Sequence, residues 1–294
     1  MKKLVRIILH YIYSVYKALA SPLRKQVVAN IVTLAPNELL KGRTAFITGA
    51  TSGIGYAIAE AFLKSGATIV IAARNKDKIA KTIEELQNLD NTDGRIFSVV
   101  MDVLNITELK DKVNEAISIL PNHKIDILVN NAGIGWVSGV TEDEEYDMIM
   151  NTDLKSVYFL SKILARHMIK ENIQGNILNI ASSSSLRPAG EVYGLAKWGV
   201  RGLTEGMAKM LIPHGIVVNA IGPGGTATPF AGKHKGDEIA FEPIPAGRFV
   251  MPEEVANVAV FLTSGMGRMI VGDVVYITGG AGTITCDDIR YEFN

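Results

Sequence analysis

A phenol and an ammonium lie one helical turn apart in the second half of this 294-residue chain, at Tyr193 and Lys197. Side chains four residues apart share one face of a helix, so these two groups can act together. A free phenol has a pKa of about 10 and holds its proton too tightly to exchange it at neutral pH. A neighbouring positive charge favours the phenolate and makes reversible proton transfer to a substrate oxygen feasible. The spacing therefore predicts an acid–base pair.

A glycine-rich turn lies far upstream of this pair, between a predicted buried strand at 44–48 and a predicted helix at 56–63. Gly49 suits a tight turn, Gly53 lets the backbone approach a pyrophosphate, and Gly55 lets the helix pack closely on the strand. The phosphates would lie on the unpaired N–H groups at the start of that helix. Combined with the acid–base pair, this turn predicts a nicotinamide-dependent oxidoreductase that interconverts a carbonyl and an alcohol.

The next strand, predicted at 68–73, indicates which nicotinamide dinucleotide is bound. An acidic residue at the end of such a strand would bind the ribose 2′-hydroxyl of NAD. Arg74 stands there instead, and a guanidinium suits a 2′-phosphate. We therefore expect NADP(H), with NAD(H) as the alternative if Arg74 belongs to a solvated basic turn.

Strands and helices continue to alternate along the chain. Further strands are predicted at 96–101 and 125–129, with helices at about 76–89 and 106–119. Almost unbroken apolar strands indicate a parallel sheet covered on both faces. With 48% hydrophobic residues and no linker rich in Pro, Gly or Ser, the chain is expected to form one catalytic domain over 41–294 behind an extension at 1–40.

Together these segments resemble the short-chain dehydrogenase/reductase family over roughly residues 41–283. The features that carry the resemblance are Thr48 to Gly55, Asp102 with Val103, Asn130 to Gly133, Asn151, a serine near 182, Tyr193 with Lys197, Pro223 with Gly224, Thr228, and Gly279 with Gly280. The family implies an α/β fold with a single Rossmann-type, doubly wound parallel sheet and helices on both faces. It also implies a homodimer or homotetramer built on the long helices that follow Asn151 and contain Tyr193.

The resemblance also implies roles for individual residues. Tyr193 would be the general acid in reduction and the general base in oxidation. Lys197 would hold the nicotinamide ribose, and Asn151 would anchor a water through which Lys197 reaches solvent. The cofactor-binding residues would be Gly49, Thr51, Ser52, Gly53, Ile54, Gly55, Arg74, Asp102, Val103, Asn131, Ala132, Gly133, Tyr193, Lys197, Pro223, Gly224 and Thr228.

A serine hydroxyl would hydrogen-bond the substrate oxygen as charge develops. Ser182 has the expected place, directly after a strand predicted at 177–181, but the interval from this serine to Tyr193 is about two residues short. The shortened loop leaves Ser183 and Ser184 open as alternatives. No metal is expected.

The N-terminal extension differs sharply in charge from the rest of the chain. Residues 1–43 hold eight Lys and Arg against one Glu, a net +7, although the whole chain is neutral. Polar side chains recur every three or four residues between Lys3 and Arg24 and leave a wide apolar face. This amphipathic pattern favours a helix over residues 1–25 lying on an anionic membrane surface. An arm packed on a neighbouring subunit is the alternative, and the charges argue against a spanning helix.

The single cysteine, Cys286, fits a reducing compartment and excludes an intrachain disulfide. We therefore expect a cytoplasmic enzyme, peripheral on the cytoplasmic face of a membrane if the arm binds lipid. Its partner would be a small carbonyl or alcohol substrate, with a lipid-like or acyl ketone favoured and a sugar, polyol or steroid as alternatives. A dinucleotide-binding scaffold or sensor without turnover is the other class of function. Nothing in the pattern favours nucleic-acid binding.

Overall fold

In the computed structural model, which describes residues 38–89, 92–234 and 237–285, the central element is a seven-stranded parallel sheet. Its strand order is β3-β2-β1-β4-β5-β6-β7. The strands are β1 (Thr44–Thr48), β2 (Thr68–Ala73), β3 (Ile96–Val100), β4 (Ile127–Asn130), β5 (Asn176–Ile180), β6 (Val217–Pro223) and β7 (Val274–Ile277). The order reverses between β1 and β4, which is where open α/β sheets bind ligands.

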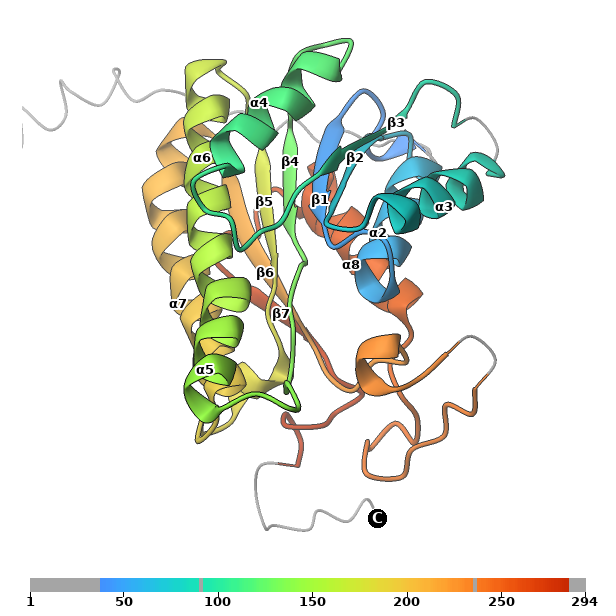
Figure 1. The fold of residues 1–294 in the computed structure, drawn as a ribbon, viewed down its shortest axis with the longest axis vertical. Coiled ribbons are helices and arrows are strands. Elements are labelled where there is room, and N and C mark those ends of the chain that lie inside the picture. Colours follow the sequence, from blue (N-terminus) through green and yellow to red (C-terminus); the bar gives the residue numbers. More distant parts are fainter. Residues whose placement is uncertain (1–37, 90–91, 235–236, 286–294) are drawn as a thin grey trace, which may run out of the picture. The chain divides into compact units, whose positions relative to one another are not determined.

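Helices cover both faces of this sheet (Figure 1). On one face lie α2 (Gly53–Lys64), α3 (Lys76–Gln87) and α8 (Pro252–Thr263); on the other lie α4 (Leu109–Ile119), α6 (Ser156–Lys170) and α7 (Val192–Leu211). A shorter helix, α5 (Glu142–Met150), continues through a π-helical turn at Asn151–Lys155 into α6. The doubly wound fold predicted from the sequence is thus confirmed.

Each face of the sheet packs against its helices in a hydrophobic core, and successive side chains of a strand belong alternately to the two cores. Ala45 and Ile47 of β1 pack with α2 and α8, whereas Phe46 between them packs with the helices of the opposite face. Phe46 pairs in register with Val70 of β2 on one side and Leu128 of β4 on the other. Both faces are buried because successive side chains of a strand point to opposite sides. The unbroken apolar runs in the sequence follow from this double burial.

The ends of most other elements differ from the sequence-based expectation by one to three residues, although two strands match it. The strands expected at 44–48 and 68–73 have those bounds, whereas β4 begins two residues later than expected and α4 three. The carboxyl ends of the strands lie together at the lower end of the molecule in Figure 1, and the loops that leave them surround the cavity described below.

Residues 1–37 and 286–294 lie outside the described residues. The amphipathic helix of the N-terminal extension and the domain boundary at residue 40 therefore remain predictions, as does the reduced state expected for Cys286. Within the described residues, no helix combines the length and apolar character that a membrane span requires.

Candidate active site

The glycine turn after β1 has the backbone conformation that its sequence predicts. Gly49 and Gly53 have φ of +66° and +54°, a region that L side chains rarely adopt. A Cβ on Gly49 would lie 3.0 Å from the Cα of Ala132, in the loop after β4. A Cβ on Gly55 would collide with the carbonyl of Gly49 and the side chain of Asn131. Glycine is therefore required for α2 to start this close to the sheet.

The start of α2 fits a phosphate group. Ser52 is the N-cap residue, yet its side chain makes no capping hydrogen bond within the described structure. The first N–H groups of a helix need acceptors from outside the helix, and a pyrophosphate can supply them. Thr51, Ser52, Gly53 and Ile54 all line the cavity at this point.

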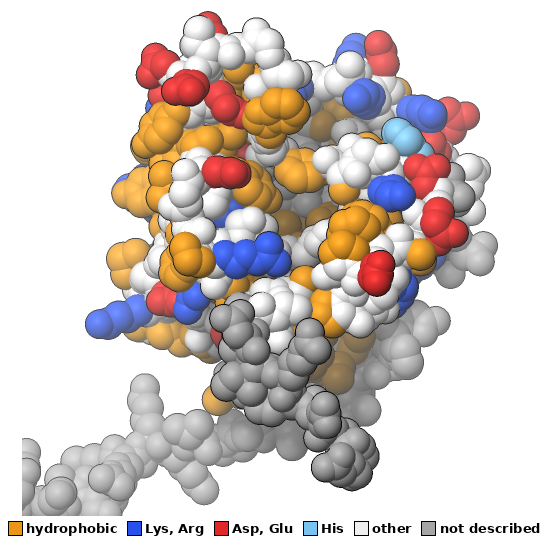
Figure 2. Space-filling view, turned by 90° about the horizontal axis from the view of Figure 1, so that it is seen from below, with side chains coloured by type: hydrophobic (Ala, Val, Ile, Leu, Met, Phe, Trp, Pro, Cys, Tyr) orange, Lys and Arg blue, Asp and Glu red, His pale blue; other side chains and the backbone are white. Residues whose placement is uncertain are grey.

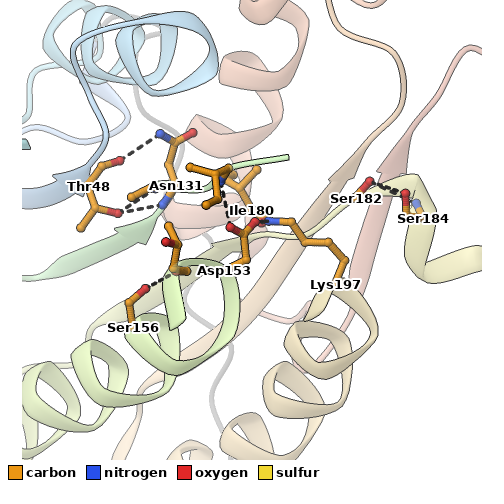
Figure 3. A network of polar contacts seen from close by, with 11 residues as sticks. Thr48, Asn131, Asp153, Ser156, Ile180, Ser182, Ser184 and Lys197 are labelled. Carbon is orange, nitrogen blue, oxygen red and sulfur yellow. Dashed lines mark hydrogen bonds and ion pairs between the residues drawn. The ribbon is translucent and has the colours of Figure 1, made fainter. Parts of the chain in front are cut away.

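Asn131 ties the loop after β4 to the glycine turn (Figure 3). Its side-chain amide donates to the carbonyl of Thr48 at 2.9 Å, and its backbone N–H donates to Thr48 Oγ1 at 3.0 Å. Asn131, Ala132 and Gly133 line the cavity next to Gly49. The two strands at the topological switch point are thus held in a fixed relation, as a dinucleotide site requires.

A second basic side chain joins Arg74 at the end of β2. Asn75 caps α3 by accepting a hydrogen bond from the backbone N–H of Lys78 at 2.8 Å. Arg74, Asn75 and Lys78 line the same part of the cavity, with Asp102 and Val103 beyond the end of β3. Arg74 was predicted from the sequence, whereas Lys78, four residues further on within the predicted helix, was not.

Tyr193 and Lys197 lie in the first two turns of α7, on its cavity side. The ammonium of Lys197 is 5.5 Å from the centroid of the Tyr193 ring. It donates to the carbonyl of Ile180, at the end of β5, at 3.0 Å. It also lies 3.0 Å from Oδ2 of Asp153 (Figure 3). Burial lowers the pKa of Lys197, but the Asp153 carboxylate and Tyr193 more than offset this, so the pKa is raised.

Asn151 lies away from Lys197 in the structure. This residue ends α5 and is not among the described residues that line the cavity, whereas Asp153 lies there in contact with Lys197. Residues two apart on a helical segment face different directions, so only one of them can face Lys197. The sequence does carry a signal for Asp153. It falls four residues after buried Ile149 and four before buried Val157, on the face that packs inward.

The three candidate serines all line the cavity, in a 3₁₀ turn that follows β5. Ser182 Oγ accepts from the backbone N–H of Ser184 at 3.1 Å and donates to Ser184 Oγ at 3.2 Å. Ser182 and Ser183 are buried and Ser184 is half-buried. Ser182 and Ser184 therefore form a hydrogen-bonded pair at the end of β5.

One cavity of about 1030 Å³ contains both halves of the predicted site. The predicted residues lie along it, except for Gly55, which packs beneath the turn, and Asn151. Large apolar side chains that the sequence analysis did not single out also line it: Trp136 is 83% exposed, Phe230 63% and Met148 37%. The Phe230 ring lies 6.1 Å from that of Tyr193. From this end of the molecule, hydrophobic side chains gather on both sides of a recess (Figure 2).

Comparison with known proteins agrees with this geometry. The profile of a family described as short chain dehydrogenase matches residues 43–238. The chain belongs to the short-chain dehydrogenase family. It is accordingly an oxidoreductase of that family.

Relatives within the short-chain dehydrogenase family differ in substrate. The chain is 35% identical to a 3-oxoacyl-(acyl-carrier-protein) reductase of Thermotoga maritima, over 82% of this chain and 98% of that protein. It is also 35% identical to a 2-dehydro-3-deoxy-D-gluconate 5-dehydrogenase of Bacillus subtilis, over 82% and 95%. Among solved structures, a 3-ketoacyl-(acyl-carrier-protein) reductase of Brucella melitensis complexed with NADH has a TM-score of 0.72 and 32% identity, over 83% of this chain and 99% of that one.

Proposed function

We propose that this protein is an NADP-dependent ketoreductase that interconverts a ketone or 3-oxo group with a secondary alcohol. The observation that carries the proposal is the single cavity that joins the glycine turn to Tyr193 and Lys197. The glycine turn and the pair of Tyr193 and Lys197 therefore open onto the same cavity, as a hydride transfer coupled to a proton transfer requires.

When bound, the nicotinamide supplies or takes up a hydride. The protein supplies the rest of the chemistry. Tyr193 donates its phenolic proton to the carbonyl oxygen in reduction and removes it from the alcohol in oxidation. Ser182 turns its hydroxyl from Ser184 Oγ to the same oxygen as negative charge develops, and the Ser184 hydroxyl can then donate to Ser182. Lys197 keeps a positive charge beside the phenol and can offer a further N–H to a ribose hydroxyl, because an ammonium carries three donors.

The preference for NADP(H) is supported by the two basic side chains at the end of β2. Arg74 and Lys78 both line the cavity there, and no acidic side chain occupies the end of β2. A 2′-phosphate would gain two charge-assisted contacts from them. The relative in Brucella melitensis carries NADH, so both dinucleotides belong in the assay.

A substrate with an apolar body is supported by Trp136, Met148 and Phe230. Exposed apolar groups at a cavity mouth mark a surface that binds apolar ligands. A 3-oxoacyl derivative or another keto lipid would place its carbonyl at Tyr193 and its chain against these side chains. The family relatives include both acyl and sugar-acid enzymes, so sugar, polyol and steroid ketones are the competing substrates.

The deciding experiment is oxidation of NADPH by the purified protein over a panel of ketones, with Tyr193→Phe alongside. The panel contains 3-oxoacyl thioesters, long-chain keto lipids, keto sugars and ketosteroids. Turnover of one class that Tyr193→Phe abolishes supports the proposal and identifies the substrate. Tight NADPH binding without reduction of any ketone would favour the scaffold or sensor alternative.

The amphipathic pattern of residues 1–25 supports a peripheral position on the cytoplasmic face of a membrane. Leu40 is fully buried and its N–H bonds to the carbonyl of Ser65, so a truncation should stop before it. Deleting residues 1–33 is expected to abolish sedimentation with vesicles containing phosphatidylserine and to leave reduction of a short soluble ketone unchanged. Vesicles of phosphatidylcholine alone are the control. An unchanged sedimentation would favour the alternative in which the arm packs on a neighbouring subunit.

A homodimer or homotetramer through α6 and α7 is supported by their exposed aromatic side chains. Tyr158 and Phe159 on α6 and Trp198 on α7 are each more than a third exposed. Burying such side chains between subunits is favourable. Light scattering coupled to size exclusion would measure the assembly, and a monomer at micromolar concentration would contradict it.

A further inference from the structure

The contact between Asp153 and Lys197 is an almost fully buried ion pair at the centre of the active site. The Asp153 side chain is 0% exposed and that of Lys197 is 6% exposed. The family resemblance implied that Asn151 anchors a water through which Lys197 reaches solvent. In the structure the charged side chain beside Lys197 is the Asp153 carboxylate. We infer that Asp153 is a positioning residue that neutralises Lys197, keeps Tyr193 protonated and biases the site toward carbonyl reduction.

Asp153 makes a hydrogen bond through one carboxylate oxygen and an ion pair through the other. Oδ1 accepts from the backbone N–H of Ile134 at 2.8 Å, and Oδ2 faces the Lys197 ammonium at 3.0 Å. A carboxylate has only acceptors and satisfies both donors, whereas an amide has one acceptor oxygen and would turn its NH₂ toward one of them. Asp153, in the π-helical turn, therefore connects the loop after β4 to α7, and the contact with α7 depends on its negative charge.

The charge of Asp153 changes what Lys197 can do for Tyr193. A lone ammonium 5.5 Å from the phenol ring would stabilise the phenolate. With the carboxylate beside it the pair has no net charge, and most of that stabilisation is lost. The carboxylate also holds the lysine proton in place, in agreement with the raised pKa of Lys197. Removal of the Asp153 charge should therefore leave the Lys197 ammonium free to stabilise the phenolate.

Other ionisable groups of the cavity lie too far away to reverse this effect. Within the described residues that line it, these are Arg74, Lys78 and Asp102, beyond the ends of β2 and β3. The neighbours of Lys197 on β5 and the following turn contribute a carbonyl and hydroxyl groups. Strands β1 and β4 separate β2 from β5, a distance of about 14 Å at ~4.8 Å per strand. That separation exceeds the Debye length of about 8 Å at physiological salt.

This inference rests on the proposed function and concerns its direction. In reduction, the carbonyl carbon accepts a hydride from the reduced nicotinamide while the carbonyl oxygen takes the phenolic proton of Tyr193. The resulting phenolate then regains a proton from water. Oxidation requires the phenolate before the reaction starts. A site that keeps Tyr193 protonated at neutral pH is prepared for the first of these directions.

The test compares Asp153→Asn with the intact protein and begins without cofactor or substrate. The appearance of the Tyr193 phenolate is followed by ultraviolet absorbance against pH, with the matching Tyr193→Phe protein subtracted. Removing one charge at this distance is expected to move the midpoint down by about one pH unit. The pH profile of alcohol oxidation should move down with it, and reduction should fall off at lower pH than in the intact protein.

Asp153→Ser provides a second neutral substitution in case the amide disturbs folding. Asp147→Asn is the matched control, because it makes the same chemical change on the exposed face of α5, six residues earlier. Circular dichroism and thermal unfolding check that each protein is folded. Agreement between the two neutral variants, with no shift in the control, supports the inference.

The outcomes separate this inference from the proposed function. An unchanged phenolate midpoint in both folded variants overturns the role of Asp153, whatever their turnover. Reduction of a ketone that Tyr193→Phe leaves at full rate would instead overturn the proposed mechanism. An equal loss of rate in both directions at every pH, without a shift of either profile, would make Asp153 a structural residue only.

Discussion

The two halves of the active site are built in different ways. The cofactor half, around β1, β2 and the start of α2, depends on backbone conformation: two glycines with positive φ, one glycine under close packing, and the N–H groups of a helix start. The catalytic half depends on side chains from separate elements. Asp153 comes from the π-helical turn, Ser182 from the end of β5, and Tyr193 with Lys197 from α7.

This difference determines how each half tolerates change. The glycine turn, here called the backbone cradle, is disrupted when a side chain replaces one of its glycine hydrogens. We expect that change to weaken cofactor binding first. An arrangement of side chains fails when a partner is removed, because a buried charge or donor is left unsatisfied.

Lys197→Gln is expected to have the largest effect on stability. It leaves the fully buried Asp153 without its ion-pair partner, which should lower the free energy of unfolding by about 3–5 kcal/mol. Urea unfolding of the apo protein measures it. Combining it with Asp153→Asn should restore part of the loss, because no buried charge then remains. Equal stability of the single and double variants would contradict the prediction.

Gly49→Ala tests the backbone cradle. A side chain at φ of +66°, with its Cβ 3.0 Å from the Ala132 Cα, should cost about 1–3 kcal/mol and weaken NADPH binding at least tenfold. Fluorescence titration with NADPH measures the affinity. Gly42→Ala is the control, because Gly42 also has a positive φ, of +75°, but a Cβ there meets no atom within 4 Å. The control should lose stability and keep its affinity.

Arg74→Gln combined with Lys78→Gln tests the choice of dinucleotide. Arg74 and Lys78 are exposed, so each lost contact is expected to cost about 1–1.4 kcal/mol, which together should reduce the preference for NADPH over NADH about 30–100-fold. The ratio of the two dissociation constants is the measurement. Lys76→Gln, an exposed lysine of the same helix outside the cavity, is expected to leave the ratio unchanged. A similar change in that control would point to a general effect of charge.

Glu254→Gln is expected to have the smallest effect. The guanidinium of Arg248 and the backbone N–H of Met251 lower the pKa of Glu254 from 4.5 to about 2. A carboxyl whose pKa is lower in the folded than in the unfolded protein stabilises the fold at pH values above its unfolded-state pKa. That contribution disappears as the pH falls from 4.5 toward 2. Both side chains are 42% exposed, so solvent screening limits the contribution to under about 1 kcal/mol. Thermal unfolding between pH 5 and 2 should show a flatter profile for the variant.

Much of the cofactor half could be predicted because its determinants are local in sequence. A strand, a glycine turn and a helix follow one another, and each glycine acts on the backbone within a few residues of itself. Arg74 was predictable for the same reason, as the residue directly after a strand. The pair of Tyr193 and Lys197 was predictable because one helical turn joins them.

Other parts of the site depend on contacts between distant segments. Whether Asn151 or Asp153 faces Lys197 depends on the rotation of the π-helical turn against α7, which motif order alone does not specify. The position of Phe230 beside Tyr193 likewise depends on how the segment after β6 folds back over the cavity.

The sequence by itself determined the sheet, the glycine turn and the proximity of Tyr193 and Lys197, because periodicity and short spacing control them. Only the tertiary structure decided which charged group accompanies that pair. The partner of the buried Lys197 ammonium is selected by packing between elements, which places the Asp153 carboxylate against this ammonium and against the backbone N–H of Ile134.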